Sequence, residues 1–355
     1  MSQLMLIINP GSTSTKIALF DGNQKKSEEN IRHDAKELSA FDNVADQFDF
    51  RMQGINGWIN SLTLKDGDLK AVVGRGAPLK PLEGGSYEIS DELLDAVKTA
   101  KYSNHASNLG PIIASHLGKK FSVPSLISDP ITVDNFTDIA RISGVPEIPR
   151  KCRSHALNIK EVSRREALKD GKTLEEASFV ACHMGGGISV AALQRGKIVD
   201  VNDGLLGMGP FSPDRAGALP IGGLVKLCYS GEFTEKQLVE KLSRKSGLIA
   251  YLGESDLIKI EQRIKTGDKE TLLYFNAMAY QIAKEIGIAA TVLNGDFDAI
   301  ILTGGMANSK MLTDEIKKYI SFLGDVRVVP GEFEMEALAA AGVRFLNGEE
   351  KIKKY

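Results

Sequence analysis

The sequence of 355 residues contains 43% hydrophobic and 25% charged residues, which is ordinary for a globular protein, and its length predicts about two domains. The formal net charge of −2 gives no reason to expect nucleic acid or a membrane surface as a partner. No apolar run approaches the roughly 20 residues that a membrane helix needs, and no signal-peptide pattern begins the chain. A cytoplasmic protein is therefore expected.

The cysteines do not indicate a disulfide framework or a zinc site. The sequence has 3 of them, Cys152, Cys182 and Cys228, and none forms a Cys-x-x-Cys pair. Both kinds of site need closely spaced cysteine or histidine residues. We therefore expect free thiols in a reducing compartment.

The first predicted element is a β-hairpin at residues 4–20. Apolar runs flank the turn Asn9-Pro10-Gly11, which is followed by hydroxyl residues and Lys16. A turn of small residues leaves backbone N–H groups free to face an anion, and the hydroxyls and the lysine favour phosphate. The segment is not a Walker A loop, because Lys16 is followed by a predicted strand instead of Ser/Thr and a helix.

Strands and helices alternate along the rest of the chain, which predicts an α/β architecture. Helices are expected where apolar residues recur at helical spacing, with Ser90, Thr313 and Asn108 as candidate capping residues. The last helical segment is expected to extend to residue 353 and to pack on the first domain. The predicted helices cover 90–101, 272–293, 313–324 and 334–348, and the predicted strands cover 69–76, 125–129, 297–305 and 326–330.

An internal repeat is the strongest indication of domain organisation. Residues 177–201 repeat the order of elements found at 4–20, with glycines at 185–187 in the turn and a third strand added. Two copies of one unit, half a chain apart, predict a duplicated domain, although two unrelated hairpins remain the alternative. The duplication predicts two glycine turns that face each other across a nucleotide cleft. A strand that runs into Gly304-Gly305 and then a helix fits nucleotide binding, but such turns also occur for packing reasons.

These motifs together resemble the acetate/butyrate kinase family, within the sugar kinase/Hsp70/actin superfold. The proline of the first turn, the stretch at 129–144 and the chain length resemble the butyrate kinase branch more than acetate kinases. The segments that carry the resemblance are IINPGSTSTK (7–16), VGRGAPL (73–79), NHASNLGP (104–111), ISDP (127–130), CRSHALN (152–158), CHMGGGISV (182–190), PDRAGALP (213–220) and LTGGMANS (302–309).

The resemblance implies a role for individual residues of this chain. The residues that it implies in binding phosphate or Mg²⁺ are Asn9, Ser12, Ser14 and Lys16. The active-site arginines and aspartate correspond to Arg75, Arg215 and Asp129; His155 and Asn108 are further candidates. The second phosphate hairpin corresponds to His183, Gly185, Gly186 and Gly187, and the adenosine turn to Gly304 and Gly305. The acidic metal residue is taken as Glu336, with Glu332 and Glu334 as alternatives because the register is open.

The sequence departs from the acetate kinase pattern at two positions. Lys151 stands where acetate kinases have an active-site histidine, four positions before His155. Gly186 stands where they have an asparagine in the second hairpin, so one side-chain donor is missing.

The resemblance implies two duplicated actin-like (ribonuclease H-like) domains with a nucleotide cleft between them, and a homodimer or larger homo-oligomer. The first domain is expected at 1–132 plus 337–355, with the acyl substrate and the first phosphate hairpin. The second is expected at 133–336, with the second hairpin and the adenosine site.

The activity implied is Mg²⁺-assisted transfer of the γ-phosphoryl group of ATP to butyrate, with isobutyrate or another branched-chain acid, or acetate, as alternative acceptors. A carboxylate is already ionised at neutral pH and needs no general base. Arginine suits the reaction because it stays charged and binds carboxylate or phosphate in bidentate fashion. We expect Arg75 to orient the acyl carboxylate, Arg215 to neutralise the phosphoryl group, and Asp129 to hold Mg²⁺ or orient an arginine.

Three other functions are weighed against this one. A sugar kinase of the same superfold would use Asp129 as a base for a hydroxyl group. A chaperone or filament protein like Hsp70 or actin would bind ATP without this chemistry, and a third possibility is a binding protein that has lost catalysis. The ordered motifs argue against the first, the short chain against the second, and the retained arginines against the third.

Overall fold

The computed structural model describes residues 2–65 and 67–355, and the chain divides into two compact units. Unit 1 comprises Met1–Val133 and Phe333–Tyr355, and unit 2 comprises Asp134–Glu332. Among the described residues, no helix combines the length and apolar character needed to span a bilayer.

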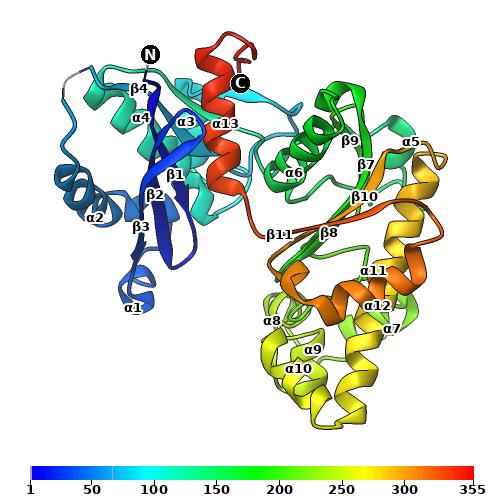
Figure 1. The fold of residues 1–355 in the computed structure, drawn as a ribbon. Helices are drawn as coiled ribbons and strands as arrows, with labels where there is room; N and C mark the ends of the chain where they lie inside the picture. Colours follow the sequence, from blue (N-terminus) through cyan, green and yellow to red (C-terminus); the bar gives the residue numbers. More distant parts are fainter. Residues whose placement is uncertain (1, 66) are drawn as a thin grey trace. The chain divides into compact units, whose positions relative to one another are not determined.

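Unit 1 is built on a six-stranded sheet with the order β3-β2-β1-β4-β6-β5 (Figure 1). β1 and β2 form the antiparallel hairpin that the sequence predicts, with Asn9 opposite Lys16. β1, β4 and β6 run parallel, so their carboxyl ends meet at one edge of the sheet. The strands are β1 (Leu4–Pro10), β2 (Ser14–Asp21), β3 (Gln24–Arg32), β4 (Leu69–Arg75), β5 (Ser86–Glu88) and β6 (Ser125–Ser128).

Side chains alternate between the two faces of this sheet along each strand, and helices pack on both faces. Leu6, Ile8 and Val72 share a buried core with α4, whereas α13 approaches Met5 and Val73 closely at Gly342. The helices of unit 1 are α1 (Ala35–Leu38), η1 (Val44–Gln47), α2 (Phe48–Ser61), α3 (Asp91–Lys98), η2 (Ala106–Asn108), α4 (Leu109–Phe121) and α13 (Glu334–Leu346).

The C-terminal helix packs on unit 1, as expected, but it ends at Leu346 instead of continuing to residue 353. Gly348 adopts a φ of +71°, a left-handed conformation that commonly terminates helices. The chain then becomes extended, and the backbone of Lys353 exchanges hydrogen bonds with the edge strand β5.

Asn108, a candidate cap, occupies the N-cap position of α4, but its side chain accepts no capping hydrogen bond. The helix α4 begins at Leu109, and the Asn108 amide donates to the carbonyl oxygens of Val97 and Ser103 instead of accepting from the helix N-terminus. Ser90 caps α3 as predicted, by accepting a hydrogen bond from Leu93 N.

Unit 2 repeats the arrangement of unit 1. Its five-stranded sheet has the order β11-β10-β7-β8-β9, with β7, β8 and β9 antiparallel and β7, β10 and β11 parallel. The order β9-β8-β7-β10-β11 matches β3-β2-β1-β4-β6 in direction, strand by strand, which confirms the predicted duplication. The strands are β7 (Ser178–Met184), β8 (Ile188–Gln194), β9 (Lys197–Val201), β10 (Ala299–Gly304) and β11 (Val326–Pro330).

The long helix α11 forms the core of unit 2 with β7 and β8, as its apolar spacing predicts. The helix predicted at 313–324 begins earlier, at Lys310, because Ser309 and not Thr313 accepts the N-terminal hydrogen bond. The helices of unit 2 are α5 (Asp138–Arg141), α6 (Ala156–Lys169), η3 (Leu174–Glu176), α7 (Ile221–Cys228), α8 (Glu235–Arg244), α9 (Leu248–Leu252), α10 (Leu257–Lys265), α11 (Lys269–Val292), η4 (Gly305–Asn308) and α12 (Lys310–Ile320).

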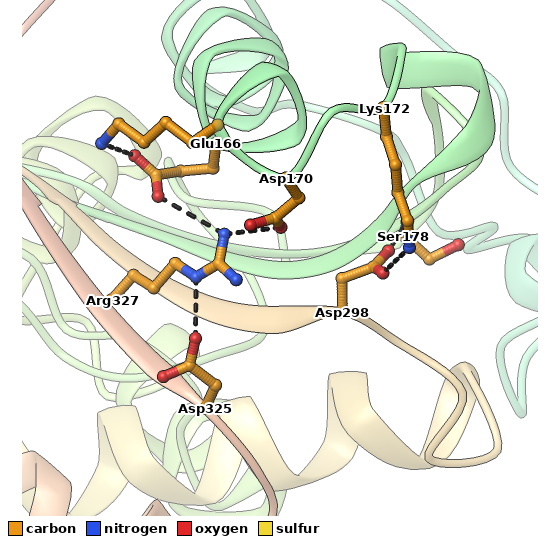
Figure 2. A network of polar contacts seen from close by, with 8 residues as sticks. Glu166, Asp170, Lys172, Ser178, Asp298, Asp325 and Arg327 are labelled. Atoms are coloured by element: carbon orange, nitrogen blue, oxygen red, sulfur yellow. Dashed lines mark hydrogen bonds and ion pairs between the residues drawn. The ribbon is translucent and has the colours of Figure 1, made fainter.

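An ionic network joins the edge strand β11 to the end of α6 (Figure 2). Arg327 lies 2.8 Å from Asp170, 2.8 Å from Asp325 and 3.5 Å from Glu166. Hydrogen bonding to Asp170 raises the pKa of Arg327. The network has a structural role within unit 2, and Arg327 therefore serves below as a control for arginines with other roles.

The three thiols are free, as predicted. Cys152 and Cys182 are buried and Cys228 is exposed on α7. Burial raises the pKa of Cys152 to about 12, so its thiolate is scarce at neutral pH.

Candidate active site

Three side chains from distant parts of the chain meet in unit 1, where β1 and β4 end and α13 begins. Arg75 Nη1 lies 3.0 Å from Asn9 Oδ1 and 2.9 Å from Glu334 Oε2, and Nη2 lies 2.9 Å from Glu334 Oε1. Asn9 Nδ2 donates to Glu334 Oε2 at 2.8 Å. The side chains of Arg75 and Glu334 are 23% and 17% exposed, so a ligand in solution can reach this bidentate pair.

The acidic member of this cluster is Glu334 and not the Glu336 named from the sequence. Glu336 lies 3.5 Å from Lys25 Nζ instead. Residues two apart on a helix do not share a face, so Glu334 and Glu336 of α13 cannot both point at Asn9. Glu332, the remaining alternative, belongs to unit 2, where its carboxylate lies near Gly185.

Gly76 and Gly110 allow the backbone around Arg75 to pack closely against neighbouring segments. A Cβ atom at Gly76 would lie 2.5 Å from Pro130 Cα, and one at Gly110 would lie 2.2 Å from the carbonyl oxygen of Arg75. Neither contact is possible for a larger residue. The VGRG segment therefore brings the end of β4 against α4 and against the chain that follows β6.

Asp129 lies at the carboxyl end of β6, next to the strand that carries Arg75. Ser128 pairs with Arg75 in register, and Asp129 is buried directly after it. Its Oδ1 accepts a hydrogen bond from Gly85 N at 2.8 Å. Asp129 has a φ of +37°, an uncommon conformation for a residue with a side chain and one that often occurs at functional sites.

The turn of the first hairpin is exposed at its tip. Gly11 N donates to Ser14 O at 2.7 Å, which closes the turn, and Ser12 and Thr13 are exposed. Lys16 is exposed on β2 opposite Asn9. Of the residues predicted to bind phosphate or Mg²⁺ here, Ser12 and Lys16 are thus exposed, Ser14 is half-buried and Asn9 is buried.

A residue that sequence reasoning missed lies behind this turn. Arg51 of α2 is 1% exposed, and its guanidinium contacts the backbone of the turn. The signal was present in the sequence: Arg51 stands at helical spacing with Ile55 and beside Met52, on the apolar face of α2.

His183 of the second hairpin stacks on His155, which precedes α6. The rings of His155 and His183 lie 4.0 Å apart at an angle of 15°. Asn158 Nδ2 lies 2.8 Å from His183 Nδ1, and Ser189 Oγ lies 2.9 Å from His155 Nδ1. The structure therefore brings His155 next to His183, at the strand end where the glycine turn begins.

Arg215 lies directly against the glycine turn of this hairpin. A Cβ atom at Gly187 would lie 2.4 Å from Arg215 Nη1, and Nη1 donates to Gly204 O at 2.5 Å. Burial lowers the pKa of Arg215, partly offset by the nearby Asp214. Arg215 Nε is buried and lies 3.9 Å from Asp214 Oδ1, and it has no hydrogen-bond partner in the described part of the chain.

The Gly304-Gly305 turn has a packing reason as well as a possible binding role. Gly304 has a φ of +91°, and a Cβ atom there would lie 2.3 Å from Met184 O. Around Gly305 a Cβ atom would meet open space. Gly304 thus serves the close approach of β10 to β7, and Gly305 leaves room for a ligand.

His105 lies near Arg75, in a segment that the resemblance singled out. His105 Nδ1 lies 2.8 Å from Ser107 Oγ, and burial together with the charge of Arg75 lowers the pKa of His105. Asn108, a possible site residue, is buried, and its Oδ1 has no partner among the described residues.

Comparison with known proteins identifies relatives over the full chain. The model of the Acetokinase family matches residues 148–337. Butyrate kinase 2 of Clostridium acetobutylicum is 46% identical over 351 residues, which cover 99% of this chain and 99% of that protein. The chain belongs to the acetokinase family.

Solved structures of acetokinase-family proteins have the same fold. The acetate kinase of Porphyromonas gingivalis matches with a TM-score of 0.77 and 19% identity, over 97% of this chain and 100% of that chain. A propionate kinase of Francisella tularensis matches with a TM-score of 0.73 and 17% identity, over 96% of this chain and 98% of that chain. These similarities confirm the predicted fold class.

Both departures from the acetate kinase pattern lie in unit 2 of this acetokinase-family chain. Lys151 is exposed ahead of α6, whereas His155, four residues later, is at the N-terminus of that helix. The carbonyl oxygen of Gly186 accepts from Ser212 Oγ at 2.5 Å. A Cβ atom at Gly186 would come no closer than 3.9 Å to Asp214, so packing does not require glycine there.

The chemistry of the acetokinase family implies a Mg²⁺ ion, and the side-chain oxygens of Asn9 and Glu334 in unit 1 are suitable ligands for it. The described residues contain no group of three or more His, Cys, Asp or Glu side chains that could hold a metal ion by themselves. Mg²⁺ is usually bound by one or two carboxylates together with water and substrate phosphates. Glu334 offers a carboxylate of this kind, and Asn9 an amide oxygen, which here accepts from Arg75 Nη1 while Asn9 Nδ2 donates to Glu334 Oε2.

Proposed function

We propose that this protein transfers the γ-phosphoryl group of ATP to the carboxylate of butyrate or of another short-chain fatty acid. The observation that carries the proposal is the full-length similarity to a butyrate kinase, with 46% identity. The exposed Arg75 at the carboxyl edge of the unit 1 sheet adds chemical support, because this edge is where α/β folds bind ligands.

Arg75 is the residue that we assign to the acyl substrate. Its guanidinium already binds one carboxylate in bidentate fashion, that of Glu334. The carboxylate of a fatty acid is ionised at neutral pH and can take the same geometry without a general base. Arg75 would hold the nucleophilic oxygen in line with the phosphoryl group.

Asn9 and Glu334 are the residues that we assign to Mg²⁺, with Glu334 in place of Glu336. Bound there, Mg²⁺ supplies neutralisation of the phosphate charges. Glu334 would hold the metal through its carboxylate, and Arg75, which pairs with Glu334 in this structure, would then be available to the substrate. Asp129 orients this edge of the sheet through Gly85 and does not act as a base.

Phosphate and nucleotide roles are assigned within each unit separately. Ser12, Ser14 and Lys16 of unit 1 donate to phosphate, and the glycine turn at 185–187 of unit 2 offers backbone N–H groups. Arg215, with its unused Nε–H, neutralises the charge of the phosphoryl group in transit. Gly304 and Gly305 form the adenosine turn. The acyl substrate belongs to unit 1 in this proposal, and the adenosine to unit 2.

The reaction predicts acyl phosphate formation that depends on ATP and Mg²⁺. Incubation with ATP, hydroxylamine and a panel of acetate, butyrate and isobutyrate is expected to give an acyl hydroxamate, with butyrate the best acceptor. The preference follows from burial of the acyl chain, since each buried methylene contributes about 0.8 kcal/mol. The coloured iron complex of the hydroxamate measures the rate.

A panel of sugars with ATP serves as the control. Sugar phosphorylation with no hydroxamate from any acid would favour the sugar kinase alternative. ATP hydrolysis without transfer to any acceptor would favour an ATP-gated binding protein.

We further propose that the protein is cytoplasmic, where ATP is available, and that it forms a homo-oligomer through α7. Ile221, Val225 and Cys228 share one face of α7, and Ile221 and Val225 are 77% and 49% exposed. Large apolar side chains on one exposed face favour a protein contact.

This proposal predicts that Cys228 reacts with a thiol-specific dye faster in dilute protein than in concentrated protein. Burial in the oligomer covers Cys228 at high concentration, whereas Cys152 and Cys182 stay unreactive throughout. Stopped-flow absorbance measures the rate, and sedimentation measures the mass. Val225→Glu should give a monomer whose Cys228 reacts at one rate. A wild-type monomer at all concentrations would contradict the proposal.

A further inference from the structure

The guanidinium of Arg51 forms the floor of the first hairpin turn. Nη1 donates to Gly11 O at 2.8 Å and to Ser14 O at 3.1 Å, and Nη2 donates to Ser12 O at 3.1 Å. Nε and Nη2 also donate to Gln47 Oε1, at 3.1 and 2.8 Å. One side chain of α2 therefore binds three carbonyl oxygens of a turn that lies 37 to 40 residues earlier in the sequence.

These contacts determine which way the N–H groups of the turn point. In a trans peptide the C=O bond and the next N–H bond point in opposite directions, and the described chain has no cis peptide. Because the carbonyls of Gly11 and Ser12 face Arg51, the N–H groups of Ser12 and Thr13 point away from it. Within the described residues, neither N–H group donates to a protein acceptor. Arg51 thus aims two free donors outward.

Other contacts also hold the turn in this conformation. Thr15 Oγ1 accepts from Arg51 Nη1 at 3.2 Å and lies 2.9 Å from His33 Nε2. His33 N donates to Thr13 O at 2.9 Å. Burial and the charge of Arg51 lower the pKa of His33, so the ring is neutral at neutral pH. The side chains behind the turn therefore surround one cation, the guanidinium of Arg51.

Among the residues that the structure describes, that cation has no anionic partner. Each hydrogen-bond acceptor of Arg51 in the described chain is a neutral oxygen, from a carbonyl, an amide or a hydroxyl group. Burial lowers the pKa of Arg51 to about 10, which still leaves the guanidinium charged at neutral pH. A buried charge is costly unless it is compensated, and the neutral oxygens around Arg51 compensate it by hydrogen bonds alone. An anion in front of the turn would supply the missing charge.

We propose that Arg51 is a positioning residue for the phosphate end of the nucleotide: it presets the donors of the turn and places a positive charge behind them without touching the ligand. This inference rests on the phosphate role proposed for the first hairpin. Arg51 acts through the backbone of Gly11–Ser14, so its loss affects ATP and spares the acyl substrate.

The test compares Arg51→Met with Arg327→Met in the full-length protein. We expect Arg51→Met to raise the KM for ATP by about 10- to 100-fold, the loss that follows from removing charge-assisted hydrogen bonds. The KM for butyrate should stay within about 2-fold, since that substrate is assigned to Arg75. Arg327→Met breaks an arginine network elsewhere in the chain, where the arginine side chain is 23% exposed, and should lower Tm with the KM for ATP unchanged (Figure 2).

Chemical rescue tests whether ATP binding needs the charge and shape of the Arg51 guanidinium and not only the volume of the side chain. In Arg51→Ala, millimolar guanidinium chloride should restore ATP affinity, because the ion fits the site of the lost side chain. Urea has the same planar shape but no charge and should not restore it. Arg327→Ala should respond to neither compound.

Two outcomes would overturn the inference. One is an Arg51→Met variant with lowered Tm and an unchanged KM for ATP, and the other is an equal rise of KM for both substrates. Ser12→Ala and Lys16→Ala distinguish this from a failure of the proposed hairpin role. If those variants also leave the KM for ATP unchanged, the phosphate role itself is wrong; if they raise it while Arg51→Met does not, only the inference about Arg51 is wrong.

Discussion

Arg75→Ala is expected to lower kcat for acyl phosphate formation by about 10²- to 10³-fold, the usual cost of losing a preorganised donor to a developing charge. The physical reason is that an anionic acceptor must approach a polyanionic nucleotide, and Arg75 supplies a positive charge at the carboxyl edge of the unit 1 sheet. The side chain is 23% exposed and held in place by Asn9 and Glu334. The hydroxamate assay at saturating ATP and butyrate measures the effect.

Arg75→Lys is the matched control for charge. Lysine keeps the positive charge but cannot bind a carboxylate through two parallel hydrogen bonds, so we expect it to recover only a small part of the lost rate. Thermal unfolding of both variants checks that the fold persists. Turnover close to wild type in Arg75→Ala would rule out the assigned role.

Glu334→Gln is expected to shift the Mg²⁺ concentration needed for half-maximal activity upward and to lower kcat by about 10- to 100-fold. A neutral amide is a weaker ligand for a hard cation than a carboxylate. Titration of activity with MgCl₂ at fixed ATP gives the measurement. The same titration of Glu336→Gln should match wild type, because Glu336 contacts Lys25 and not Asn9.

The pair of variants decides between two assignments. Both substitutions remove one negative charge from the first turn of α13, so a difference between them depends on which side each residue faces. A change in Mg²⁺ dependence confined to Glu336→Gln would restore the assignment made from the sequence. A spectroscopic titration of each variant with Mn²⁺ gives a readout of metal binding that is independent of turnover.

The sequence determined much of the fold because its information was local and repeated. Apolar runs on either side of a small-residue turn predicted both hairpins, and the recurrence of one unit at 4–20 and 177–201 predicted the duplication that the two sheets confirm. Ordered motifs along the whole chain identified the family. Capping was predicted less well: Ser90 caps α3 as expected, whereas Asn108 is used by tertiary hydrogen bonds.

Only the tertiary structure decided which side chains meet. The choice of Glu334 over Glu336 depends on the rotation of α13 about its axis on the unit 1 sheet, and packing sets this rotation. Arg51 is visible in the sequence as a charge on an apolar helix face, but its partners are carbonyl groups of residues 11–14. Backbone carbonyls carry no side-chain identity, so no pattern of residue types reveals such a contact before the chain is folded.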